Sequence, residues 1–163
     1  METTMWYDET KGMIGCQHYP RECRLISACC SKVFPCRLCH DEAETGHQIE
    51  RKETRECVCC RCKTIQPASN ACISGQCKGA PFASYWCDIC KLWDSTPGKE
   101  IYHCAGCGIC RVGKGLGIDR RHCDTCGCCY HMVAFEGHKC IPRKLHNECS
   151  VCRVDMFQST KPV

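Results

Sequence analysis

The sequence has few of the residues from which a hydrophobic core is built. Leu, Ile, Val and Phe together account for 26 of the 163 residues, which is below the level of about 20% at which chains tend to stay disordered unless something else holds them together. No amphipathic pattern of three helical turns occurs. The low content of apolar residues excludes a Rossmann sheet, a TIM barrel and a helix bundle, because each needs a large apolar core. Cross-links must supply the stability that burial does not.

The sequence also lacks a secretion signal and a membrane span. The segment before Cys16, METTMWYDETKGMIG, contains neither a basic region nor an apolar run of signal-peptide length. No stretch approaches the roughly 20 apolar residues of a transmembrane helix. We therefore expect an intracellular protein, in the nucleus or the cytoplasm, with no membrane partner and with reduced thiols.

Cysteine is abundant instead, at 24 of 163 residues, and its spacing favours zinc over disulfides. A C-x2-C turn directs two thiolates at one ion about 2.3 Å from each, whereas disulfide frameworks seldom close such short loops. Histidine also lies beside cysteine repeatedly, which a disulfide scaffold does not need. The C-x2-C pairs are 36/39, 57/60, 59/62, 87/90, 104/107, 107/110, 123/126, 126/129 and 149/152.

The cysteine spacing divides the chain into three segments. The first covers residues 12–79, the second residues 80–142, and the third residues 143–163, where Cys149 and Cys152 form a single pair. We expect a small zinc-stapled irregular fold of short strands and hairpins, with little helix and no large hydrophobic core. The candidate strands are Phe82–Trp86, Glu100–His103 and Tyr130–Phe135.

The second segment contains an internal repeat. The pattern H-C-x2-C-x2-C that begins at His103 returns at His122, and a short period built on metal ligands predicts a zinc ladder or spiral. If each repeat gives two ligands to the preceding ion and two to the next, the pair 87/90 starts the ladder and the pair 138/140 ends it. Twelve ligands then hold three ions, and their pairing stays open at this stage.

These patterns resemble a known family. The first segment, which opens with C-x-H-Y at residues 16–19, looks like a CHY-type zinc finger, and Cys87 to Cys140 looks like a CTCHY-type zinc finger. C-S-V-C at 149–152 is similar to the opening of a RING finger. The order resembles that of the RING-and-CHY ubiquitin ligases, and the phrase CRVGKGLGID at 110–119 is closest to the BRUTUS-type ligases of iron homeostasis.

The resemblance implies six Zn²⁺ ions, each with four Cys or His ligands. Two ions would bind the first eight ligands, a third the next four, and the last three the remaining twelve. The implied metal ligands are Cys16, His18, Cys29, Cys30, Cys36, Cys39, His40, His47, Cys59, Cys62, Cys72, Cys77, Cys87, Cys90, His103, Cys104, Cys107, Cys110, His122, Cys123, Cys126, Cys129, His138 and Cys140.

Relative to that family, the sequence stops after the first RING pair and has only a short segment before Cys16. Val151 stands where such RING fingers place an apolar residue that touches the ubiquitin-conjugating enzyme. We expect that enzyme as a partner only where the RING is completed, so this chain alone should be inactive. It looks like a fragment of a ligase or a short relative. Closed four-ligand zinc sites leave no position for a catalytic water, so we expect no catalytic residue.

Two other metal-protein classes fit less well. Cys87, Cys90, His103 and Cys107 match a C2HC DNA-binding finger, but Pro97-Gly98 interrupts the segment that would form its recognition helix. The run C-x2-C-x2-C from Cys104 begins like a bacterial ferredoxin motif but lacks the following x3-C-P. Deprotonation of 18 ligand thiols and binding of six Zn²⁺ would change the formal net charge from +4 to −2. The charge is therefore no argument for nucleic acid, and a nucleic-acid-binding zinc protein is the weakest of the alternatives.

Four cysteines remain outside these sites: Cys23, Cys57, Cys60 and Cys128. They are interpreted as small buried hydrophobic residues, with a redox or iron–sulfur sensor as the alternative. The aromatic cluster over residues 82–102 predicts a mini-core, and Trp93 is the candidate for an exposed, partner-binding residue. The function predicted overall is the part of a RING-type E3 ubiquitin ligase that binds zinc and recruits a protein client such as a transcription factor.

Overall fold

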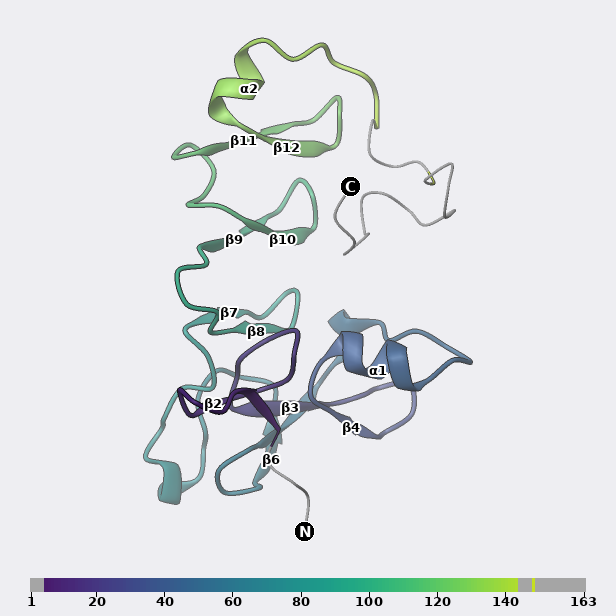
Figure 1. Ribbon diagram of the computed structural model, residues 1–163. Coiled ribbons are helices and arrows are strands. Elements are labelled where there is room, and N and C mark those ends of the chain that lie inside the picture. Colours follow the sequence, from purple (N-terminus) through teal and green to yellow (C-terminus); the bar gives the residue numbers. More distant parts are fainter. Residues whose placement is uncertain (1–4, 144–147, 149–163) are drawn as a thin grey trace. The chain divides into compact units, whose positions relative to one another are not determined.

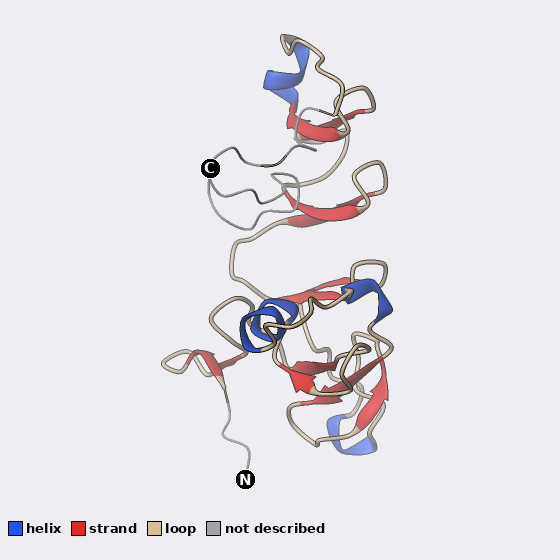
Figure 2. Cartoon of the chain, turned by 90° about the vertical axis from the view of Figure 1, so that its right-hand side faces the viewer, coloured by secondary structure: helices blue, strands red, loops and turns tan. Residues whose placement is uncertain are grey.

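The computed structural model describes residues 5–143 and 148. The chain divides into two compact units, Met1–Gly98 and Lys99–Val163. Each unit consists of short antiparallel strands, loops and little helix (Figures 1 and 2). The predicted fold class is thus confirmed. Among the described residues, no helix is both long and apolar enough to span a bilayer.

A four-stranded antiparallel sheet forms the centre of the first unit, in the order β4-β3-β5-β6. Burial alternates along β3 and β5, so that Cys23 and Leu25 on one strand and Cys57 and Cys59 on the other are buried. A period of two places these side chains on one face of a sheet, which is the face that meets the core. The strands are β3 (Cys23–Ile26), β4 (Val33–Phe34), β5 (Glu56–Cys59) and β6 (Ile65–Pro67).

Shorter elements complete the first unit. The hairpin of β1 (Trp6–Asp8) and β2 (Met13–Ile14) precedes the sheet, and the hairpin of β7 (Tyr85–Cys87) and β8 (Leu92–Asp94) follows it. Helix α1 (Arg37–Ala43) follows β4. Two 3-10 turns, η1 (Arg51–Glu53) and η2 (Gly75–Cys77), lie in the connections.

Within residues 99–143, the second unit contains two hairpins and one short helix. Strand β9 (Ile101–Cys104) pairs with β10 (Ile109–Val112), and β11 (Arg120–Cys123) pairs with β12 (Cys128–His131), which leads into α2 (Met132–Glu136). The two histidines that open the sequence repeat occupy the same place in their strands, His103 in β9 and His122 in β11. The repeat is therefore a repeat of hairpins (Figure 1).

Each of the four hairpins that begin at β5, β7, β9 and β11 carries a C-x2-C pair in its turn. The residue after the second cysteine has a positive φ in all four turns, with values of 62°, 46°, 66° and 66°. Glycine adopts this left-handed conformation without a steric penalty, and glycine occupies the position in the second unit. These residues are Lys63, Lys91, Gly108 and Gly127.

The core of the first unit is a small cluster of cysteines and aromatic residues. Phe82 and Trp93 are fully buried there beside Cys23, Cys57 and Cys59. The indole N–H of Trp93 donates to the carbonyl of Ser69 at 2.9 Å. The prediction of Trp93 as an exposed, partner-binding residue is therefore wrong: burial and this hydrogen bond make it part of the mini-core.

The three predicted strands meet different outcomes. Glu100–His103 corresponds closely to β9. Only the end of Phe82–Trp86 lies in β7, because the amide of Phe82 donates to the Asn70 carbonyl and its own carbonyl accepts from Glu22, away from any ladder. The strand predicted for Tyr130–Phe135 stops at His131. There the His131 side chain accepts from the Val133 amide at 3.4 Å and caps α2.

The boundary between the compact units falls after Gly98, inside the predicted second segment, residues 80–142. The β7–β8 hairpin belongs to the first compact unit because its Trp93 packs in the core of that unit. The division into residues 12–79, 80–142 and 143–163 is based on ligand spacing, and it stays a prediction of where the zinc-binding segments begin and end.

Candidate metal centres

The first cluster of metal-binding side chains forms where α1 begins. Cys36 is the N-cap of α1, and its Sγ accepts a hydrogen bond from the Cys39 amide at 3.3 Å. This bond turns both thiols to one side, where Cys16 and His18 meet them. The donor atoms of the four residues all lie within 4.8 Å of one another, and His18 Nδ1 is 3.4 Å from Cys36 Sγ and 3.5 Å from Cys39 Sγ.

A second cluster uses the other end of the same C-x2-C-H motif. His40 projects from α1 and places its Nε2 3.3 Å from Cys29 Sγ and 3.7 Å from Cys30 Sγ. His47 completes the group. His40 is fully buried, while Cys29 and His47 are exposed, so this site is open to solvent on one side.

The third cluster joins the turn of the β5–β6 hairpin to η2. It consists of Cys59, Cys62, Cys72 and Cys77. Cys62 Sγ lies 3.5 Å from Cys72 Sγ, and Cys59 Sγ lies 3.9 Å from Cys77 Sγ. The structure thus brings the pair 59/62, and not the pair 57/60, to the second cysteine pair.

In the second unit, one cluster connects the two hairpins. Cys104 and Cys107 from the turn of β9–β10 meet His122 and Cys129 from β11 and β12. His122 Nδ1 is 3.5 Å from Cys104 Sγ and 3.4 Å from Cys107 Sγ. The first repeat gives this cluster its middle two ligands, and the second repeat gives it its first and last ligands. Each repeat thus divides its four ligands into two pairs, as the ladder scheme requires.

The last cluster ends the ladder at Cys123, Cys126, His138 and Cys140. His138 Nε2 lies 3.3 Å from Cys123 Sγ and 3.2 Å from Cys140 Sγ, and Cys126 contacts Cys123 and His138. The helix α2 and the turn after it return the chain, so that His138 faces the β11–β12 turn.

Two further pairs of predicted ligands are each formed within one unit. The Cys90 amide donates to Cys87 Sγ at 3.4 Å, as the Cys39 and Cys107 amides do to Cys36 and Cys104 Sγ. In the second unit, His103 Nδ1 lies 3.9 Å from Cys110 Sγ across the β9–β10 ladder. Each pair supplies two of the four ligands that a structural zinc ion takes.

The spacing of the donor atoms fits zinc. A tetrahedral ion with bonds of about 2.3 Å to sulfur and 2.0–2.1 Å to nitrogen separates two sulfurs by about 3.8 Å, and a sulfur from a nitrogen by about 3.6 Å. Cys123 and Cys140 Sγ are 3.8 Å apart, and the other distances given above lie close to these values. A disulfide needs about 2.05 Å, and all described cysteines are free.

In four clusters the second ring nitrogen of a histidine has an oxygen neighbour. His40 Nδ1 lies 2.9 Å from Asp41 Oδ1, and His18 Nε2 lies 3.2 Å from Glu42 Oε1. His138 Nδ1 lies 2.7 Å from the Phe135 carbonyl, and His122 Nε2 lies 3.5 Å from the Asp124 carboxylate. Such partners fix the tautomer and orientation of a metal-binding histidine. Sequence reasoning missed them, although Asp41 follows His40 directly.

Electrostatics favours the thiolate form of one cysteine in each of two clusters. The Thr64 hydroxyl, 3.2 Å from Cys62 Sγ, is the main cause that lowers the pKa of Cys62 to about 5. The Cys126 amide is the main cause that lowers the pKa of Cys123 to about 6. Both thiols are ionised near neutral pH, and the thiolate is the form that binds metal.

Three of the four spare cysteines are buried. Cys23, Cys57 and Cys128 are at most 1% exposed, and Cys60 is partly buried. Burial raises the pKa of Cys23 well above its ordinary value and also raises the pKa of Cys60. Protonated, inaccessible thiols react slowly, so the surroundings of Cys23 favour packing over sensing, whereas the hydrogen bond with Cys23 lowers the pKa of the buried Cys57. Val151, Cys149 and Cys152, which carry the RING prediction, lie outside the described residues.

Comparison with known proteins gives one family-model match and several relatives. Residues 16–91 match the CHY zinc finger family. The zinc finger protein BRUTUS of Arabidopsis thaliana is 43% identical over 156 residues, which cover 96% of this chain and 12% of BRUTUS. An uncharacterized RING finger protein of Schizosaccharomyces pombe is 40% identical over 158 residues, 97% of this chain and 36% of that protein.

A rice protein named E3 ubiquitin-protein ligase SRFP1 is 39% identical over 150 residues, 90% of this chain and 55% of its own length. The chain therefore spans from about an eighth to about half of the relatives described here. Together with the clustered Cys and His side chains, these matches support zinc binding by a chain whose residues 16–91 resemble the CHY zinc finger family and whose sequence is similar to parts of zinc finger and RING finger proteins.

Proposed function

We propose that this chain is the zinc-stapled, partner-recruiting region of a RING-type E3 ubiquitin-protein ligase. The observation that carries the proposal is the alignment of nearly the whole chain with a protein named as such a ligase. The clusters support it because closed four-ligand zinc sites hold a surface in shape and perform no chemistry themselves. The region would present a protein client, and a RING would bring the ubiquitin-conjugating enzyme.

The zinc assignment is part of this proposal. The 24 predicted ligands would divide into groups of four, each group holding one ion. Six Zn²⁺ ions per chain are then expected. In such sites the zinc ion supplies only a charge and a fixed tetrahedral geometry. The protein supplies thiolates, oriented imidazoles and the hairpin turns that carry them.

The register of the third site can be tested with one substitution pair. Cys62→Ser should lower the zinc content by one ion per chain, because the structure places Cys62 with Cys72 and Cys77. Cys60→Ser, two residues earlier, should leave the zinc content unchanged. Native mass spectrometry measures both. Loss of an ion from Cys60→Ser alone would show that the pair 57/60 binds the metal.

Recruitment can be tested in a chimaera of the rice ligase SRFP1, in which this chain replaces the aligned segment. The chimaera should ubiquitinate a defined set of proteins in cells. A version with Cys36→Ser and Cys62→Ser should lose that set but keep self-ubiquitination, since its RING is unchanged. If both versions ubiquitinate the same proteins, the zinc-stapled region does not recruit clients.

A further inference from the structure

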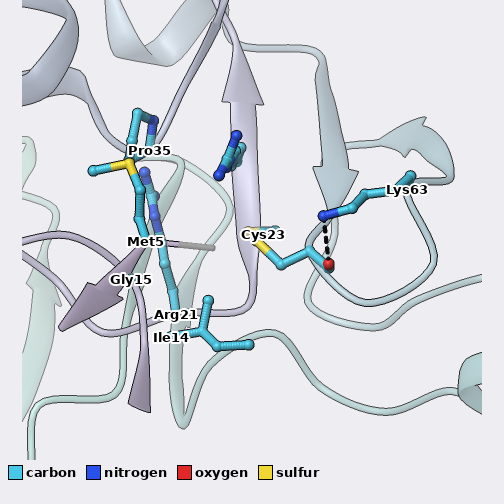
Figure 3. A pocket seen from close by; sticks show the side chains of 9 residues that line it. Met5, Ile14, Gly15, Arg21, Cys23, Pro35 and Lys63 are labelled. Atoms are coloured by element: carbon cyan, nitrogen blue, oxygen red, sulfur yellow. Dashed lines mark hydrogen bonds between the residues drawn. The ribbon is translucent and has the colours of Figure 1, made fainter. Parts of the chain in front are cut away.

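One pocket of the first unit is built from cationic and apolar side chains, apart from the metal clusters. Arg21, Arg24 and Lys63 line it together with Met5, Ile14 and Pro35, around a volume of about 40 Å³. Figure 3 shows Arg21 extending from beside Ile14 toward Met5 and Pro35. Among the described residues that line this pocket, none is acidic. Three cationic residues therefore line the pocket, and none of its described lining residues carries a carboxylate.

Arg21 is the most unusual of these residues because its guanidinium is buried and incompletely bonded. The residue is 3% exposed, and both Nε and Nη2 lack a hydrogen-bond partner. Its guanidinium carbon lies 5.5 Å from the centre of the Trp93 ring, a contact that favours the cation but bonds no N–H group. A buried donor without a partner costs about 1–3 kcal/mol, and more when it is charged.

The neighbouring carboxylate does not provide the missing partner. Glu22 follows Arg21 in the chain but pairs with Arg61. Lys63 donates one hydrogen bond to the Cys60 carbonyl at 2.8 Å, drawn as the dashed line in Figure 3. An ammonium group has three donors, so this bond positions Lys63 and leaves it able to bind a second acceptor.

We propose that this pocket binds an oxyanion, a carboxylate or phosphate group on a side chain of a protein partner. A guanidinium with two unpartnered donors matches the oxygens of either group, and Arg24 and Lys63 add positive charge. Met5, Ile14 and Pro35 provide apolar contact for the residues that flank the anion. That the anion belongs to a protein partner rests on the proposed recruiting role. That the pocket binds an anion is argued from its lining residues alone.

The first experiment follows the Arg21 Nε–H resonance of the zinc-loaded full chain by NMR. The probes are sodium phosphate and three short Gly/Ser/Leu peptides with a central phosphoserine, glutamate or glutamine, at constant ionic strength. Phosphate and at least one acidic peptide should shift the resonance saturably, and the glutamine peptide should not. A resonance that no probe moves would overturn the site. Binding of phosphate without either acidic peptide would overturn the protein source.

Matched variants distinguish binding in the pocket from attraction by the overall charge of the protein. Lys63→Gln and Arg24→Gln should each weaken binding of the acidic peptide on the order of tenfold, because each removes one charge-assisted contact. Lys52→Gln removes the same charge from an exposed position outside the pocket and should change binding less than twofold. Equal weakening by all three would overturn the proposal. The assay contains no ubiquitin, so its failure leaves the test of the ligase role unaffected.

Discussion

At the scale of single residues, the metal clusters depend on groups that orient the ligands as well as on the ligands. His40 is the clearest case, because its ring lies fully buried between two thiols and one carboxylate. Asp41 accepts from Nδ1 and thereby leaves Nε2 unprotonated for a metal. Asp41 also accepts from the Ile49 amide at 2.9 Å, which fixes the carboxylate itself.

We predict that Asp41→Asn weakens zinc binding at the Cys29/Cys30/His40/His47 cluster by about 10- to 100-fold, the usual effect of removing such a partner. Competition with a chromogenic chelator measures the change. Glu53→Gln is the control, because Glu53 is exposed and its ion pair with Arg55 is a loose contact of 4.0 Å. Equal zinc affinity in Asp41→Asn and the parent chain would show that His40 needs no orienting group.

A glycine in the second unit provides another residue-scale test. A Cβ at Gly106 would lie 2.6 Å from His122 Nε2, closer than real Cβ contacts. Gly106→Ala should therefore displace the imidazole and weaken zinc binding at the cluster of Cys104, Cys107, His122 and Cys129, on the order of tenfold for a shifted ligand.

The control for this substitution is Gly137→Ala, because a Cβ at Gly137 meets nothing within 4 Å. Cobalt substitution reports the geometry, since a tetrahedral site loses its visible absorption when one ligand leaves. An unchanged cobalt spectrum in Gly106→Ala would contradict the close approach of Gly106 and His122.

Residue-level prediction from the sequence reaches furthest where the chemistry is local. Cysteine spacing predicts that thiols 36 and 39 act together, because a C-x2-C turn needs no distant partner. Spacing leaves the registers 57/60 and 59/62 equally open, and only the family resemblance favours 59/62. The same reasoning failed for Trp93, whose burial depends on Ser69, a residue far away along the chain. Arg21 carried no signal either, since its pocket combines residues from β2, β3 and the turn after β5.

At the scale of elements, the hairpin with a C-x2-C turn is the repeating unit. It combines two short strands with a residue of positive φ after the second cysteine. In the turns that begin at Cys87 and Cys104, the first thiol also accepts a hydrogen bond from the amide of the second cysteine. The end of β12 was less predictable, because Tyr130–Phe135 has enough aromatic and β-branched residues for a strand. The His131 cap and the contact of Phe135 with His138 at 4.8 Å between ring centroids favour a helix there.

The β7–β8 hairpin should depend on Trp93 for its attachment to the first unit. Trp93→Ala removes a fully buried indole, its hydrogen bond to Ser69 and its contact with Trp86, whose ring centroid is 4.3 Å away. We expect a loss of about 3–5 kcal/mol in the free energy of unfolding, measured by guanidinium titration at saturating zinc.

Ile73→Ala is the matched control for the Trp93 substitution. Ile73 is 67% exposed, and exposed apolar residues contribute within about 0.5 kcal/mol. A similar loss in both variants, or none in Trp93→Ala, would contradict a role of this hairpin in the core.

At the scale of the whole molecule, the sequence predicted stabilisation by cross-links better than it predicted how the hairpins are divided between the compact units. A chain so poor in Leu, Ile, Val and Phe must be cross-linked, and the described cysteines do gather into clusters at metal-binding distances. The division into units after Gly98 could not be predicted from ligand spacing. It depends on one hairpin that belongs to the second segment by sequence and packs in the core of the first unit.

The whole molecule should therefore fold only with its metal. The second unit shows why most clearly: its described core consists of Cys123, Cys126 and Cys128, with Ile109, Tyr130 and Phe135 among the side chains packed against them. Two of those three cysteines belong to the predicted ligand set, so removing zinc leaves thiolates facing one another in place of a core. A structural zinc ion contributes about 10–16 kcal/mol in finger peptides, more than the entire stability of a typical small domain.

We predict that the purified chain contains six zinc ions by elemental analysis and that their removal with a strong chelator unfolds both units. Amide dispersion in the NMR spectrum should collapse, and stoichiometric Zn²⁺ should restore it, whereas Mg²⁺ should not because it prefers oxygen ligands. Four or fewer zinc ions in the fully loaded protein would contradict the ligand assignment. A dispersed spectrum after complete zinc removal would show instead that the few buried apolar side chains suffice to hold the hairpins together.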